Sequence, residues 1–212
     1  MSNEQLPSTS MSIISKKICI IGESEVGKNS LICRFVERQF SDEYLCTVGV
    51  KISRKTLEVP GAKLEGKLYL QLIIWDVTGN PKFKAIAPSY LRGSCGAVVV
   101  ADITRSETIE GIPKYIKLFL SVNPKGFIII ALNKSDLIDE EKLQKLVKLK
   151  ELEAVAAIYP TSAKTGLYVD EIFKKIAGKI IESCTIPLSP SKLLLSGEAT
   201  LTHPCKEGAE GG

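Results

Sequence analysis

The sequence predicts an α/β fold: a mostly parallel, six-stranded sheet with helices on both faces and one antiparallel hairpin at an edge. Strand-like and helix-like runs alternate along the chain, which is typical of parallel strands joined by helices. Two runs, Ala97–Ala101 and Phe127–Leu132, are apolar at every position, as strands buried on both faces are. Segments 47–59 and 67–76 lie back to back around Pro60 and Gly61, so they are expected to form the hairpin.

The individual elements follow in order from these runs. The first strand ends in the apolar run Ile18–Ile21, and the first helix begins at residue 28, after a glycine-containing loop. The expected strands are 16–21, 47–59, 67–76, 97–102, 126–132 and 156–160, and the expected helices are 28–38, 107–121, 139–155 and 168–183. Residues 1–15 are expected to be a disordered lead and 184–212 a flexible tail, on either side of one domain at 16–183.

Composition and charge exclude several classes of protein. The 212 residues are 44% hydrophobic and 25% charged, an ordinary globular balance. A net charge of +4 without long runs of Lys or Arg predicts no nucleic-acid partner and no polybasic membrane attachment. Six cysteines without a CxxC pair indicate thiols in a reducing compartment, and the one histidine, His203, leaves no basis for histidine catalysis or a zinc site.

The sequence further predicts a cytoplasmic monomer without a direct lipid anchor. No stretch reaches the ~18 apolar residues that a membrane span requires. The first residues lack the apolar core of a signal peptide, and Ser2 excludes N-myristoylation. The ending Glu210-Gly211-Gly212 contains no prenylation box.

The first functional motif is Gly-x4-Gly-Lys, which runs from Gly22 to Lys28 between a strand and a helix. In this pattern, backbone N–H groups wrap nucleotide phosphates, and the lysine reaches the β and γ oxygens. The residues expected to contact phosphate are Glu23, Ser24, Glu25, Val26, Gly27, Lys28, Asn29 and Ser30. The residue after the lysine is normally a Ser or Thr whose hydroxyl binds Mg²⁺, but here it is Asn29.

A second motif, Asp76-Val77-Thr78-Gly79, follows the third expected strand. Ligands bind at the carboxyl ends of the strands in such sheets, so this motif is expected beside the phosphate loop. Asp76 would contact Mg²⁺ through a water molecule, and Gly79 would bring its N–H to the γ-phosphate.

Two further motifs at strand ends predict a guanine pocket. In Asn133-Lys134-Ser135-Asp136, the Asp136 carboxylate would accept from guanine N1–H and the N2 amine, which adenine does not match. Asn133 would tie loops together, and Lys134 would lay its stem along the base. Ser162, Ala163 and Lys164 follow the last strand, where the Ala163 N–H would donate to guanine O6. The alternative for residues 133–136 is a polar loop with a helix cap at Ser135.

These motifs, in this order, resemble the Ras superfamily of small GTPases. The resemblance is strongest to Rab-like members, including those of some bacteria, and covers residues 16–183. It is carried also by Thr47-Val48-Gly49-Val50, Ile86 through Gly93, Ala101-Asp102-Ile103-Thr104 and Thr161 through Gly166.

The resemblance implies a P-loop NTPase (small G-protein) fold, GTP and GDP as ligands, and Mg²⁺ as cofactor. Thr47 would contact the γ-phosphate and join Asn29 and Asp76 as a metal ligand. Segments 40–49 and 76–92 would change conformation with the nucleotide and bind effector, exchange and activating proteins. A place at a membrane would then require a protein partner. The residues expected to face an effector are Phe40, Tyr44, Val48 and Trp75, with hairpin core as the alternative.

Several residues depart from the family pattern. The expected catalytic residues are Lys28, Gly79 and Asn80, but Asn80 stands where a longer glutamine would orient water, and Pro81 stiffens the same segment. Glu25 replaces a small residue, with its carboxylate expected to point outward, and the 59–67 turn is longer than usual. Two interpretations follow: a switch with slow GTP hydrolysis, or a catalytically impaired module that holds GDP.

Overall fold

The computed structural model describes residues 11–40, 50–59, 67–77, 87–139 and 155–185. Its strands are β1 (Met11–Ile21), β2 (Val50–Glu58), β3 (Lys67–Val77), β4 (Gly96–Asp102), β5 (Phe127–Asn133) and β6 (Val155–Pro160). Its helices are α1 (Lys28–Glu37), α2 (Ala87–Leu91), α3 (Ser106–Glu110), α4 (Ile112–Val122) and α6 (Val169–Thr185), with a 3₁₀ turn at Ser135–Leu137.

The strands form one six-stranded sheet in the order β2-β3-β1-β4-β5-β6. Strand β1 pairs in parallel with β3 and β4, and β5 pairs in parallel with β4 and β6. The β2–β3 pair is antiparallel and lies at the edge. The predicted fold class, including its edge hairpin, is therefore confirmed.

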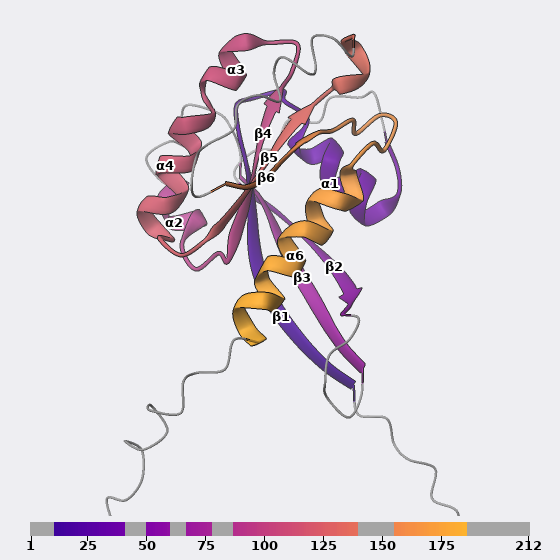
Figure 1. Ribbon diagram of the computed structural model, residues 1–212, viewed down its shortest axis with the longest axis vertical. Coiled ribbons are helices and arrows are strands. Elements are labelled where there is room, and N and C mark those ends of the chain that lie inside the picture. Colours follow the sequence, from indigo (N-terminus) through magenta and orange to yellow (C-terminus); the bar gives the residue numbers. More distant parts are fainter. Residues whose placement is uncertain (1–10, 41–49, 60–66, 78–86, 140–154, 186–212) are drawn as a thin grey trace, which may run out of the picture.

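Helices cover both faces of this sheet (Figure 1). On one face, α1 and α6 pack together over β1, β3 and β4, where Phe35 stacks on Phe173 with ring centroids 4.0 Å apart. On the other face, Leu91 of α2 and Ile116 and Phe119 of α4 pack against alternate residues of β1, β4 and β5. All residues of β4 are buried, which is the arrangement that its apolar run predicts.

The structure corrects the start of the first strand. Strand β1 begins at Met11, so residues 11–15 belong to the sheet and not to a disordered lead. They are held because Ser12 through Ser15 continue the parallel ladder opposite Leu68 through Gln71 of β3. The polar serines that suggested a lead lie within this ladder.

The helix expected at 107–121 is two helices, α3 and α4, separated at Gly111. Pro113 stands in the first turn of α4, where its missing N–H costs nothing, whereas the interior of one continuous helix would exclude it. Helix α2 was not predicted. Most of the helix expected at 139–155 lies outside the described residues, and Val155 belongs to β6.

The described helices include none that is both long and apolar enough to cross a membrane. The carboxyl ends of the parallel strands β1, β3, β4, β5 and β6 point to one edge of the sheet. The predicted motifs follow these ends, so the topology gathers them on one side of the molecule.

Candidate guanine-nucleotide site

The loop between β1 and α1 is shaped by residues with positive φ. Gly22, Glu25 and Gly27 have φ of 150°, 64° and 93°. A Cβ at Gly27 would lie 2.3 Å from Asn133 Nδ2, and one at Gly22 would lie 2.1 Å from the Val100 carbonyl oxygen. Both positions therefore require glycine. The loop leads directly into the N-terminus of α1, which favours negatively charged groups.

Lys28, the first residue of α1, turns its ammonium back onto this loop. Its side chain is buried, and its ammonium donates to the carbonyl oxygens of Gly22 at 3.1 Å and Glu23 at 2.6 Å. A cation held against the loop in this way suits the phosphate-binding role predicted for it.

Two other loop residues have distinct surroundings. Glu23 forms an ion pair with Lys114 of α4 at 3.6 Å. Burial, followed by the nearby Glu23 carboxylate, raises the pKa of Tyr115 above its usual range. Glu25 is exposed, in line with the outward direction expected for its carboxylate.

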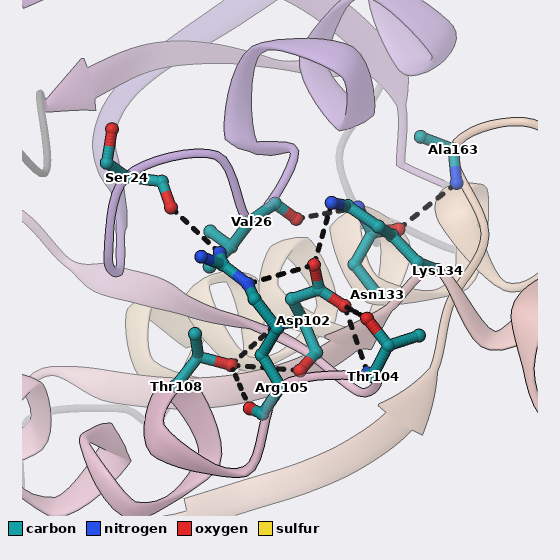
Figure 2. A network of polar contacts seen from close by, with 9 residues as sticks. All are labelled: Ser24, Val26, Asp102, Thr104, Arg105, Thr108, Asn133, Lys134 and Ala163. Carbon is teal, nitrogen blue, oxygen red and sulfur yellow. Dashed lines mark hydrogen bonds and ion pairs between the residues drawn. The ribbon is translucent and has the colours of Figure 1, made fainter.

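Asn133, the last residue of β5, joins three loops (Figure 2). Its Nδ2 donates to the Val26 carbonyl oxygen at 2.9 Å, which links it to the phosphate loop. Its Oδ1 accepts from the Ala163 N–H at 3.1 Å, which links it to the loop after β6. The expectation that this side chain ties loops together agrees with the structure. The Ala163 N–H, expected to donate to guanine O6, donates to Asn133 Oδ1 in this structure.

The rest of the predicted guanine pocket lies beside Asn133. Asp136 is exposed, and one of its carboxylate oxygens accepts from Ser162 Oγ at 2.6 Å. Lys164 is exposed, and its carbonyl oxygen accepts from the Arg34 guanidinium. Arg34 also donates to the Ala163 carbonyl oxygen at 2.8 Å, so α1 fixes the loop after β6.

Asp102, the last residue of β4, contacts the loop after β5 through Lys134, and it was missed as a site residue (Figure 2). Its buried carboxylate accepts from Lys134 Nζ at 2.7 Å, Arg105 Nε at 3.2 Å and Thr104 Oγ1 at 2.6 Å. Arg105 also donates to the Ser24 carbonyl oxygen at 2.9 Å, so it contacts the phosphate loop. The available signal was an acidic residue at a buried strand end.

The charge of Asp102 is stabilised by its neighbours. Burial alone would raise the pKa of this carboxyl, but the hydrogen bonds from Lys134 and Thr104 and the charge of Lys134 lower it further than burial raises it. A carboxyl with a lowered folded-state pKa stabilises the fold above its unfolded pKa. This contribution is lost as the pH falls through the lowered value.

We expect Asp102→Asn to lower the free energy of unfolding by about 2–3 kcal/mol, because it leaves Lys134 and Arg105 beside a neutral amide. Denaturant unfolding at pH 7 measures the loss. The difference from wild type should shrink as the pH falls below the ordinary Asp pKa of 3.8, because the unfolded wild-type chain then takes up a proton that the folded carboxylate, with its lowered pKa, does not. Asp170→Asn is the matched control, since its ion pair with Arg38 is largely exposed and is expected to contribute less than ~1 kcal/mol. Equal losses in the two variants would contradict the structural role of Asp102.

Two of the predicted metal ligands, Asn29 and Asp76, lie among the described residues. Asn29 Oδ1 accepts from Lys51 Nζ at 3.3 Å and from Cys33 Sγ at 3.7 Å. Asp76 is buried near the end of β3, opposite Lys51 of β2. A carbonyl oxygen has two lone pairs, so the Asn29 oxygen is fully engaged. Thr47, Gly79 and Asn80 lie outside the described residues, as do Tyr44 and Val48.

Two of the residues expected to face an effector are packed in the structure. Trp75 is partly buried against the core that includes α2 and α4, with the Lys17 ammonium 3.8 Å from its ring centroid. Phe40 is partly buried against the other core. Each side chain is only partly buried, and its contact with an effector stays a prediction.

Comparisons with known proteins agree with this geometry. The family model described as "Ras family" matches residues 17–182. The chain is 33% identical to Ras-related protein Rab-22A of Canis lupus familiaris over 184 residues, covering 86% of this chain and 92% of that protein. It is 33% identical to Ras-related protein Rab-31 of Homo sapiens over 201 residues, covering 94% and 97%. It is 36% identical to GTP-binding protein ypt5 of Schizosaccharomyces pombe over 173 residues, covering 79% and 78%. With the family model spanning nearly the whole sheet and its helices, the chain belongs to the Ras family of small GTPases and is Rab-like.

Proposed function

We propose that this chain is a guanine-nucleotide switch that alternates between GDP and GTP, hydrolyses GTP slowly, and acts through effector proteins in signalling or trafficking. The observation that supports this most is the side chain of Asn133, which holds the phosphate loop and the two base loops together. A pocket for a whole nucleotide needs these loops in fixed relation, because phosphate and base are bound by different loops.

The phosphates are proposed to bind residues 23–30, with the Lys28 ammonium and the loop N–H groups balancing their charge. Guanine specificity is assigned to Asp136, whose two oxygens suit the adjacent N1–H and N2 donors of guanine. The Ser162 hydroxyl positions this carboxylate. Lys134, anchored through its Nζ to Asp102, would lay its aliphatic stem along the base.

Hydrolysis is proposed as an in-line attack of water on the γ-phosphorus: the new P–O bond forms as the bond to the β–γ bridging oxygen breaks, GDP leaves, and the proton of the water passes to the released phosphate. Lys28 would stabilise the developing charge, the Gly79 N–H would hold the γ-phosphate, and Asn80 would orient the water. Asn80 is one methylene shorter than the usual glutamine, so the water would be held less accurately and turnover would be slow.

Segments 40–49 and 76–92 are the proposed binding surfaces for effectors and for exchange or activating proteins. A peripheral membrane position would depend on such a partner. The alternative function is a GDP-holding module without catalytic turnover. Lys51 favours this alternative, because its ammonium contacts the oxygen that would otherwise be offered to a metal.

The proposed function is tested by titrating nucleotide-free protein with GDP, GTP, ADP and ATP, and by following phosphate release from bound GTP. We expect guanine nucleotides to bind at least ~100-fold more tightly than adenine nucleotides. Phosphate release should be slow, on the order of 10⁻⁴ per second. Equal affinity for both bases would refute guanine recognition, whereas GDP binding with no phosphate release would select the GDP-holding module.

A further inference from the structure

The side chain of Asn29 is already in contact with a cation. Asn29 is the second residue of α1 and directly follows Lys28, at the point where the phosphate loop enters the helix. The Lys51 ammonium donates to Asn29 Oδ1 at 3.3 Å, and the Cys33 thiol donates to the same oxygen at 3.7 Å. A metal ion could bind this oxygen only by displacing one of these two donors.

The position of Lys51 is fixed by the sheet. Lys51 belongs to β2, the edge strand, and pairs directly with Asp76 of β3. In this antiparallel register their Cβ atoms point to the same face of the sheet. The surroundings of Cys33 agree: burial raises the pKa of its thiol, the Lys51 charge lowers it, and the Glu37 and Asp76 charges raise it. The Lys51 and Asp76 charges therefore both act on Cys33, whose thiol shares the Asn29 oxygen with Lys51.

The space near Asn29 Oδ1 suits the Lys51 ammonium alone better than it suits the ammonium together with a metal ion. A lysine ammonium has three N–H donors, and one of them is used by Asn29. The other two N–H groups could donate to phosphate oxygens. A divalent ion in the same space would be repelled by the ammonium, and Mg²⁺ tolerates little distortion of its octahedral shell.

We propose that Lys51 is a tethered cation of the nucleotide site, which takes the place of Mg²⁺ at Asn29 and lets the chain hold GDP without a metal. This assignment rests on the proposed function, since it concerns the same phosphate site. It makes Lys51 a phosphate-binding residue contributed by the edge strand. The single charge of the ammonium balances the phosphates of GDP better than those of GTP, so the assignment also favours the GDP-bound form.

The test is the affinity for GDP in MgCl₂ and in EDTA, measured for wild type, Lys51→Gln and Lys55→Gln. Lys55 is the matched control, because it lies on the same strand and face but donates to the Val36 carbonyl oxygen at the far end of α1. We expect wild type and Lys55→Gln to lose less than about threefold in affinity on removal of Mg²⁺. Lys51→Gln should bind GDP about tenfold or more weakly in EDTA and recover affinity in MgCl₂, because Asn29 Oδ1 becomes available to the metal.

A second measurement determines the affinity for the metal ion directly. Binding of Mn²⁺ to the GDP-loaded proteins, followed by electron paramagnetic resonance, should be about tenfold tighter in Lys51→Gln than in wild type. A wild type that depends on Mg²⁺ as strongly as Lys51→Gln, or equal Mn²⁺ affinities, would overturn the role of Lys51 while leaving the proposed function in place. Failure of wild type to bind GDP in either condition would overturn both.

Discussion

Replacing Asp136 by asparagine is expected to change the preferred base from guanine to xanthine. The carboxylate of Asp136 offers two acceptors, which suit N1–H and the N2 amine of guanine. An amide offers one acceptor and one donor, so it opposes the N2 amine with another donor. Xanthine carries a carbonyl oxygen at C2 in place of this amine, and it matches the amide. We expect GDP affinity to fall about 100- to 1000-fold, or about 3–4 kcal/mol, with xanthosine diphosphate gaining by a similar factor.

Competition binding with GDP and xanthosine diphosphate measures this change. Asp139→Asn is the matched control. Asp139 is a nearby exposed carboxylate on the same segment, and it has no proposed contact with the base. It should leave both affinities within about twofold, because exposed charges contribute little at physiological ionic strength. An Asp136→Asn protein that loses GDP without gaining xanthosine diphosphate would show that the carboxylate holds the loop through Ser162 and does not read the base.

The parts of the fold that the sequence predicted best are those governed by short-range pattern. Continuous apolar runs located β4 and β5 because a strand buried on both faces has no polar position. One strand boundary was wrong and one helix was missed, because both depend on distant partners. The start of β1 is set by pairing of Ser12 through Ser15 with β3, more than fifty residues away. Helix α2 is short, and its burial through Leu91 is a tertiary effect.

The candidate site shows the same division. Motif spacing singled out Lys28, Asn133 and Asp136 as candidates, since each stands at or shortly after a strand end or helix start that the local pattern fixes. Spacing could not show that Asn29 contacts Lys51, because this contact joins a helix to an edge strand. It also could not show that the Ala163 N–H donates to Asn133, because that hydrogen bond depends on how β5 and β6 are aligned. Side-chain contacts of this kind depend on how the elements are arranged in three dimensions, which motif spacing does not specify.

Replacing Gly22 by alanine is expected to be the most destabilising single change at this site. The added Cβ would lie 2.1 Å from the Val100 carbonyl oxygen and 3.1 Å from its carbon. Val100 is buried in the middle of β4, so its backbone cannot move away without disturbing pairing with β5. We expect the free energy of unfolding to fall by about 4 kcal/mol or more. Losses of this size are typical of overpacking and backbone strain in the protein interior. Denaturant unfolding without nucleotide isolates this effect from ligand binding.

Gly178→Ala is the matched control for this substitution. Gly178 is exposed on α6, and a Cβ there would meet nothing within 4 Å. The same added methyl group should therefore stabilise the protein by about 0.5–1 kcal/mol through helix propensity. Opposite signs for the two variants would locate the cost in the contact with Val100. A loss below ~1 kcal/mol for Gly22→Ala would mean that the loop can leave β4 freely, and the close approach could then not be what fixes the start of the phosphate loop.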